Sequence, residues 1–149
     1  TPEFPGFPQE GLRFLAELRD NNNREWFEAH KQAYRTDILA PAQDLAFALG
    51  ERLKQSISPG IVYDTATNGS GSILRIYRDV RFSADKTPYN TRVRLIFWEG
   101  QRKKMENPSF FVRIQPDGVG LYVGLHVFPK VGCQLVQRRV YGVHRPGRR

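Results

Sequence analysis

The first third of the chain carries apolar side chains at helical spacing. Between Gln9 and Asp20 they fall three or four residues apart, which predicts a short amphipathic helix. A second helix is predicted from Arg24 to Arg35, where aromatic and semi-polar side chains repeat at the same steps. A third is expected from Pro41, whose missing N–H suits a first helical turn, to about Gln55. The positions that define these helices are Leu12, Phe14, Leu15, Leu18, Trp26, Phe27, His30, Tyr34, Leu45, Leu49 and Leu53.

The second half of the chain changes to patterns typical of β-strands. Strands are predicted near residues 73–77, 91–98, 109–115 and 119–128. The turns between the later strands are short, so we expect antiparallel pairing, since parallel pairing needs long crossovers. Helices followed by strands predict an α+β fold, in which the N-terminal helices pack against a mainly antiparallel sheet.

The chain divides into two parts by pattern. We expect residues 1–130 to form a single α+β domain, because 149 residues suffice for one substantial core. Residues 131–149 show neither a helical stripe nor a clean alternation, and glycine and proline interrupt them. We predict that this tail lies on the surface or is disordered, and that some apolar surface of the sheet or helices stays exposed.

The net charge of +8 is uneven along the chain. The tail, residues 131–149, holds five arginines and no acid, so residues 1–130 carry only +3. Nucleic-acid binding through the tail and the basic turn Arg102–Lys104 is therefore a lesser alternative, because bulk charge is weak support for a polyanion partner.

Other classes of site are not indicated by the sequence. No window approaches the ~20 apolar residues of a membrane span, so we expect no membrane partner. The single cysteine, Cys133, cannot form an internal disulfide, which favours a cytoplasmic location. Together with His30, His126 and His144 it shows no paired metal-ligand spacing, so no metal site is predicted. The cofactor and the oligomeric state stay open.

The stretch from Ser72 to Tyr89, SILRIYRDVRFSADKTPY, concentrates charge of both signs. Guanidinium groups can hold a carboxylate or phosphate with two hydrogen bonds, so several arginines close together suit a small anionic ligand. Asp79 and Asp85 would orient those arginines or transfer protons, and are the candidate catalytic residues. The candidate ligand-binding residues are Arg75, Arg78, Arg81, Lys86 and Tyr89.

The same charges fit a second interpretation with equal weight. They can form salt bridges that only brace the fold of a structural or protein-interaction module. Arginines paired internally, with no adjoining cleft, would favour this bracing role. Arginine tips open to a pocket would favour a binding site, and the reaction, if any, is not indicated.

Four blocks of the sequence resemble a known family, domain-of-unknown-function family 2461 of bacteria and fungi. They are FLAELRDNNNREWFEAHKQAY (Phe14–Tyr34), the proline-led helix at Pro41, SILRIYRDVRFSADKTPYNT (Ser72–Thr91) and GVGLYVGLHVFP (Gly118–Pro129). The resemblance covers about residues 7–130. It implies no activity and no catalytic residue, because family members are described as hypothetical proteins. Such members continue past the sheet into helical sequence, so the C-terminal part of this chain is expected to be divergent or truncated.

Overall fold

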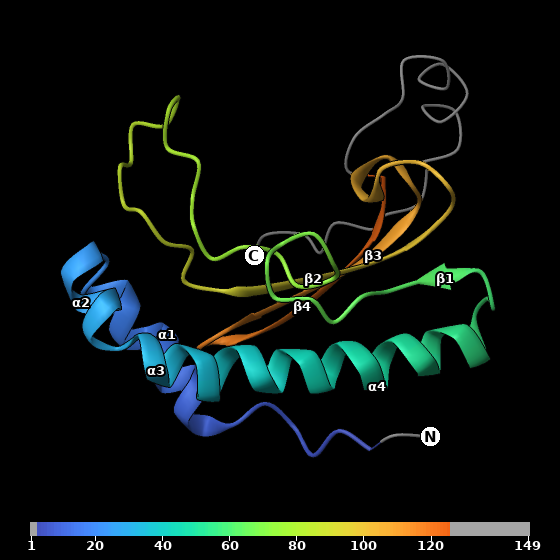
Figure 1. The fold of residues 1–149 in the computed structure, drawn as a ribbon, viewed down its shortest axis with the longest axis horizontal. Coiled ribbons are helices and arrows are strands. Elements are labelled where there is room, and N and C mark those ends of the chain that lie inside the picture. The colour runs from blue at the N-terminus through green and yellow to red at the C-terminus, as the bar shows by residue number, and fades with distance from the viewer. Residues whose placement is uncertain (1–2, 126–149) are drawn as a thin grey trace, which may run out of the picture.

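The apolar stripes of the N-terminal half form a layer of helices in the computed structural model, which describes residues 3–125 (Figure 1). The first helix, α1 (Gln9–Asp20), has the predicted bounds. After it comes α2 (Arg24–Ala29), and from Lys31 to Ser56 the chain is helical throughout. This last segment consists of α3 (Lys31–Ala33), the π-helical turn η1 (Tyr34–Leu39) and α4 (Ala40–Ser56).

The helix boundaries differ from the prediction at two places. The helix expected over residues 24–35 breaks at His30, and the helix expected to start at Pro41 is already running there. Proline has no N–H to donate to the carbonyl four residues earlier, which would end an ordinary α-helix. Here the chain widens instead, as the hydrogen bond from the Ala40 N–H to the Arg35 carbonyl five residues back shows.

A four-stranded antiparallel sheet forms the second layer, which confirms the α+β fold. Its strands are β1 (Ile61–Val62), β2 (Val93–Glu99), β3 (Ser109–Gln115) and β4 (Gly118–Gly124), paired in that order. Short connections join β2 to β3 and β3 to β4. Strand β3 has the predicted bounds. The predicted end of the last strand, residues 126–128, lies outside the described residues, as does the tail, residues 131–149.

The strand predicted over residues 73–77 is wrong. Ile73 forms only an isolated bridge with Leu95, flanked by hydrogen bonds from the Ile96 N–H to the Ser72 carbonyl (2.8 Å) and from the Leu74 N–H to the Arg94 carbonyl (2.9 Å). The segment therefore follows the edge of β2 for three residues and then leaves it. The fourth strand of the sheet is β1, which the sequence pattern did not indicate.

The core lies between the helices and the inner face of β2 and β3. Val93, Leu95 and Phe97 point to this face, as the alternation predicts, and are buried. Aromatic rings from the helices pack beside them, among them Phe14 and Phe27, whose centroids lie 6.4 Å apart. The remaining buried members of the core are Leu15, Leu18, Ile38, Ala42, Ala46, Ile61, Ile73, Ile76, Tyr89, Val112 and Ile114.

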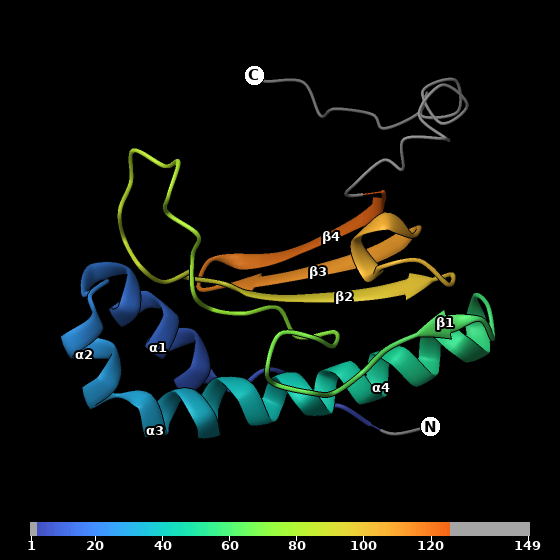
Figure 2. The same ribbon diagram turned by 45° about the horizontal axis from the view of Figure 1, so that its top comes forward.

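The helices do not cover the whole sheet. Helix α4 packs against β1 and β2, and β4 is the edge strand farthest from this helix (Figure 2). Val119, Leu121 and Val123 of β4 continue the inner face but are 67%, 74% and 73% exposed. Apolar surface of the sheet is thus open in the part of the chain that the structure describes, as expected. No helix in this part combines the length and the apolar character needed to cross a membrane.

Candidate functional site

The charged stretch forms a projecting loop, residues 78–88, which we call the arginine loop (Figure 1, yellow-green). Its stem is a short antiparallel pair. The Arg78 N–H donates to the Pro88 carbonyl (2.8 Å), the Asn90 N–H donates to the Ile76 carbonyl (2.7 Å), and Tyr77 bridges Tyr89. The stem fixes both ends of a loop that otherwise extends away from the sheet.

The stem is anchored to the helices by Tyr89 and Asn22. The Tyr89 ring is buried and stacks on Phe27, with centroids 4.2 Å apart. Asn22 lies between α1 and α2, where its side chain donates to the Tyr89 carbonyl (2.9 Å) and accepts from the Tyr89 N–H (3.1 Å). This amide satisfies both backbone groups of one residue, so the loop is positioned by the helical layer.

Arg78 is the best-held charged group of the loop. Its Nη1 donates to the Thr87 carbonyl (2.9 Å) and Oγ1 (2.6 Å) and lies 3.1 Å from Asp85 Oδ2. Its Nη2 makes only a 3.5 Å contact with Ser83 Oγ. The side chain is 23% exposed, so one end of the guanidinium is fixed and the other retains donor capacity.

Asp85 supports this arrangement as an ionised group. Its Oδ1 accepts hydrogen bonds from the Thr87 N–H (3.0 Å) and Oγ1 (2.8 Å). These bonds, and to a lesser extent Arg78, lower the pKa of the Asp85 carboxyl from its ordinary value of 3.8. Asp85 is therefore a carboxylate at neutral pH and a weak base.

Asp79 and Arg81 form an ion pair with each other in the part of the loop beyond the stem. Arg81 donates through Nε to Asp79 Oδ1 (2.9 Å) and through Nη2 to Oδ2 (2.6 Å). The hydrogen bonds from the Arg81 side chain and backbone lower the pKa of the Asp79 carboxyl to about 2. Both side chains are largely exposed, so this pair contributes little to stability.

A polar cleft of about 350 Å³ lies between the arginine loop and the end of α1. Three of its lining residues are arginines and one is an aspartate, so its walls carry a net charge of +2. Arg19 makes a single 3.4 Å contact with exposed Asp117, and Arg92 has no hydrogen bond or ion pair to another described residue. The cleft is lined by Arg19, Asn22, Arg78, Asp85, Thr87, Tyr89, Asn90, Thr91 and Arg92.

The structure brings only part of the predicted set to this cleft. Of the candidates, Arg78, Asp85 and Tyr89 line it, and the Tyr89 ring lies mainly in the core. Four candidates lie elsewhere: Arg75, Asp79, Arg81 and Lys86.

Arg75 and Lys86 make local contacts instead. Arg75 is exposed, with its guanidinium 5.7 Å from the centre of the Tyr77 ring. Lys86 Nζ donates to the Val80 carbonyl (2.7 Å) within the loop. Neither side chain is among those that line the cleft.

Sequence reasoning missed Arg19, Asn22 and Arg92 as members of this site. Asn22 lies between two predicted helices, where asparagine ordinarily serves to end or cap a helix. Its neighbours do this: Asn23 Oδ1 caps α2 by accepting from the Trp26 N–H (2.8 Å), and Asn21 Nδ2 donates to the Glu17 carbonyl (2.9 Å). The only available signal was that a run of three asparagines exceeds what one helix junction needs.

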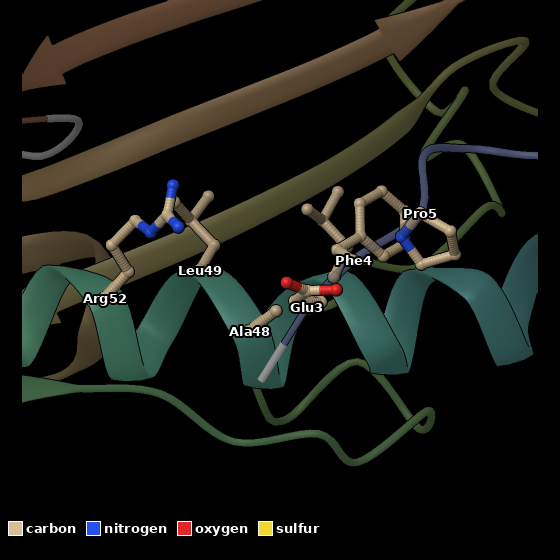
Figure 3. A pocket seen from close by; sticks show the side chains of 7 residues that line it. Glu3, Phe4, Pro5, Ala48, Leu49 and Arg52 are labelled. Carbon is tan, nitrogen blue, oxygen red and sulfur yellow. The ribbon is translucent and has the colours of Figure 1, made fainter. Parts of the chain in front are cut away.

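A further cavity lies away from this charge. It has about 590 Å³ and separates the N-terminal segment from α4. Figure 3 shows Glu3, Phe4 and Pro5 beside Ala48, Leu49 and Arg52, and Leu45 completes the lining. Glu3 and Arg52 are the charged residues of this largely apolar groove, and they do not form a cluster of polar groups that could hold a ligand. We therefore interpret this cavity as incomplete packing of the N-terminal segment against α4.

The basic turn Arg102–Lys104 is less available than its composition suggests. Lys104 Nζ donates to the carbonyls of Gly69 (2.6 Å) and Gly71 (2.7 Å), which fastens the preceding polar loop. Burial lowers the pKa of this amine. Across residues 3–125, moreover, no three His, Cys, Asp or Glu side chains gather as a potential metal site.

Comparison with known proteins places the chain in a family without naming an activity. No curated protein and no solved structure matches it significantly. A family described as "Conserved hypothetical protein (DUF2461)" matches residues 10–145, which is most of the sequence. The match includes the arginine loop, both cleft arginines outside the loop, and much of the region beyond residue 130. The chain therefore belongs to the conserved hypothetical family DUF2461.

Proposed function

We propose that the cleft beside the arginine loop binds a small anion, a phosphate or a carboxylate. The observation that carries this proposal is the position of Arg78. Its guanidinium is fixed at one end by Thr87 and Asp85 and lines a cleft with two further arginines. Fixing a guanidinium in advance reduces the entropy lost on binding, so a held arginine suits recognition better than a free one.

The neighbouring amides act as positioning groups. Asn22 is committed to the backbone of Tyr89, and Asn90 Nδ2 donates to the Ile76 carbonyl (3.1 Å). The ligand would thus be held by charge and by the guanidinium donors of Arg19, Arg78 and Arg92. A small, multiply charged anion fits this donor set and the cleft volume of about 350 Å³.

The two aspartates support binding better than proton transfer. The lowered pKa values of Asp79 and Asp85 keep both carboxylates ionised at neutral pH. A general base works best when its pKa lies near the working pH, which is far from either group. We assign Asp85 the role of orienting Arg78, and Asp79 that of holding Arg81.

Calorimetric titration of the 149-residue chain with inorganic phosphate and with citrate tests the proposal. Arg78→Gln should weaken binding at least about tenfold, equivalent to roughly 1.4 kcal/mol. Arg81→Gln is the matched control, because it removes an arginine of the same loop that lies outside the cleft. Equal affinity in wild type and Arg78→Gln, or no binding of either anion by the wild type, would refute the proposal.

The bracing role remains a second candidate, favoured by the internal partners of Arg78. If Arg78 only braces the loop, Arg78→Gln should lower the free energy of unfolding by about 1–3 kcal/mol. The wild type would then show no stabilisation by phosphate in thermal unfolding. Binding and bracing are therefore separated by the anion response and not by the stability loss alone.

A further inference from the structure

A second group of arginines lies on the outer face of the sheet, opposite the helices. Arg94 of β2 and Arg113 of β3 are direct cross-strand partners. Both are next to inward-facing core residues, so their side chains point to the outer face. Like charges placed directly opposite across an antiparallel pair repel each other. Arg92, which immediately precedes β2, adds a third positive charge beside them.

No carboxylate compensates these charges among the described residues. Arg94 Nη2 donates to the Arg75 carbonyl (3.2 Å), and Arg113 Nη2 donates to the Tyr122 hydroxyl. Arg113 Nε is buried and has no hydrogen-bond partner in the described chain. Residues 126–149 contain no aspartate or glutamate, so no acidic side chain there can supply the counter-charge.

The environment of Arg94 reflects the same imbalance. Burial first, and then the nearby Arg92, lower the pKa of its guanidinium. An arginine still keeps its charge at neutral pH, because its ordinary pKa is so high. The protein therefore holds a partly desolvated positive charge at this position. A bound anion would offset the repulsion from Arg92 and would replace the lost solvation of the guanidinium with a direct ionic contact.

These arginines line a cavity of about 410 Å³ whose remaining walls are largely apolar. From β4 it is lined by Tyr122, Val123 and Gly124. Arg113 pairs with Gly120 across the strands, and the Tyr122 ring lies over Gly120, 2.7 Å from where a Cβ would be. The other lining residues are Leu74, Met105, Phe111, Val112 and Leu125.

We propose that this outer cavity is a second binding site, which takes a small organic anion with an apolar or aromatic body. The uncompensated pair Arg94 and Arg113 would hold the carboxylate or phosphate group. The ring of Tyr122 and the apolar walls, such as Leu74 and Met105, would cover the body. A body of this kind separates the ligand class from the small, multiply charged anions proposed for the cleft, whose walls are polar.

The outer cavity is tested with 2-naphthoate, its neutral isostere 2-naphthamide, and inorganic phosphate. Calorimetry on the 149-residue chain should show that naphthoate binds, and that the neutral isostere binds at least about tenfold more weakly. Arg94→Gln and Arg113→Gln, on different strands, should each weaken naphthoate binding by at least about tenfold. Arg102→Gln, an exposed arginine outside the cavity, should not. Arg92 is left unchanged because it lines both sites.

Amide chemical shifts of the wild type locate the bound naphthoate without any substitution. The changes in chemical shift on adding naphthoate should centre on Gly120, Tyr122 and Gly124, and they should persist in Arg78→Gln. Shifts centred on Asn90 and Thr91 that vanish in Arg78→Gln would place the ligand in the cleft and overturn this second site. Equal binding of naphthoate and naphthamide, or no binding of naphthoate, would overturn it as well. Binding of inorganic phosphate, and its loss in Arg78→Gln, tests the cleft alone. Each of the two proposals can therefore be refuted without refuting the other.

Discussion

At the scale of single residues, the role of each arginine is decided by the groups within hydrogen-bond reach. Arg81 meets Asp79 two residues away and forms an exposed pair with it. Arg78 meets a carboxylate, a hydroxyl and a carbonyl of its own loop, and is held on one side. Arg94 and Arg113 meet no acid in the described chain. One residue type thus serves as a surface partner, an oriented donor and an uncompensated charge.

The Asp79–Arg81 pair gives a prediction about pH. The pKa of Asp79 is about 2 in the folded chain, against an ordinary value of 3.8. Because the folded-state pKa is lowered, the contribution of the pair to stability is present above about pH 3.8 and is lost as the pH falls through 2. Carboxyl carbon NMR should give a midpoint near 2 for Asp79 and a clearly higher midpoint in Arg81→Gln, which removes the guanidinium but keeps the hydrogen bond from the backbone N–H of residue 81. A midpoint that the substitution does not move would contradict the pairing.

Asn22 gives a prediction about stability. Asn22→Ala removes both side-chain partners of the Tyr89 backbone and should cost about 1–3 kcal/mol of unfolding free energy, measured by denaturant titration. Asn21→Ala is the control, because its side chain makes one exposed hydrogen bond and should cost well under half as much. Equal losses in the two variants would show that Asn22 does not dock the loop.

The sequence indicated a positively charged site in this stretch, but it did not identify all the residues that line the cleft. Arg78 and Asp85 were found because they lie in one dense charged stretch. Arg19 was missed because it reaches the cleft from α1, and a single sequence carries no signal for such long-range proximity. The same applies to Asn22, whose partner Tyr89 is 67 residues away. Arg92 lies close to Tyr89 in the sequence but was counted with the strand predicted over residues 91–98.

At the scale of elements, predictions succeeded where one periodicity governed a whole segment. The alternation around β3 and the stripe of α1 are of this kind, and both elements have the predicted bounds. The segment 73–77 also alternates, yet only its beginning lies along β2, since Tyr77 pairs with Tyr89 to close the loop stem. The helix at Pro41 was misjudged because a π-helical turn accommodates the missing N–H, which local propensity does not reveal.

The uneven cover of the sheet gives a prediction about packing. Leu95→Ala, in a fully buried position of β2, should cost about 2–5 kcal/mol of unfolding free energy. Leu121→Ala lies on the same face in β4 and is 74% exposed, so it should change this free energy by no more than about 0.5 kcal/mol. Denaturant titration measures both. A loss for Leu121→Ala as large as that for Leu95→Ala would mean that this face of β4 is covered.

At the scale of the whole molecule, the two-layer arrangement creates both proposed sites. Within residues 3–125 the helices pack on the inner face of the sheet, and Arg94 and Arg113 lie on the outer face. The arginine loop rises at one end of the sheet (Figure 2). Its residues Arg78, Asp85 and Thr87 line the polar cleft together with Arg19 of α1. Arg92, just before β2, lines both cavities. The positive charge of the described chain is therefore gathered at particular places, although the excess over residues 1–130 is small.

Anomalous diffraction from crystals of the 149-residue chain soaked in selenate, a tetrahedral anion like phosphate, tests the central claim most directly. The account predicts a selenium peak in the cleft, with its oxygens within hydrogen-bond distance of the Arg78 guanidinium and of Arg19 or Arg92. Crystals of Arg81→Gln should retain this peak, and crystals of Arg78→Gln should lose it. A cleft without selenium in the wild type, while selenate occupies other arginines of the same crystal, would contradict the account.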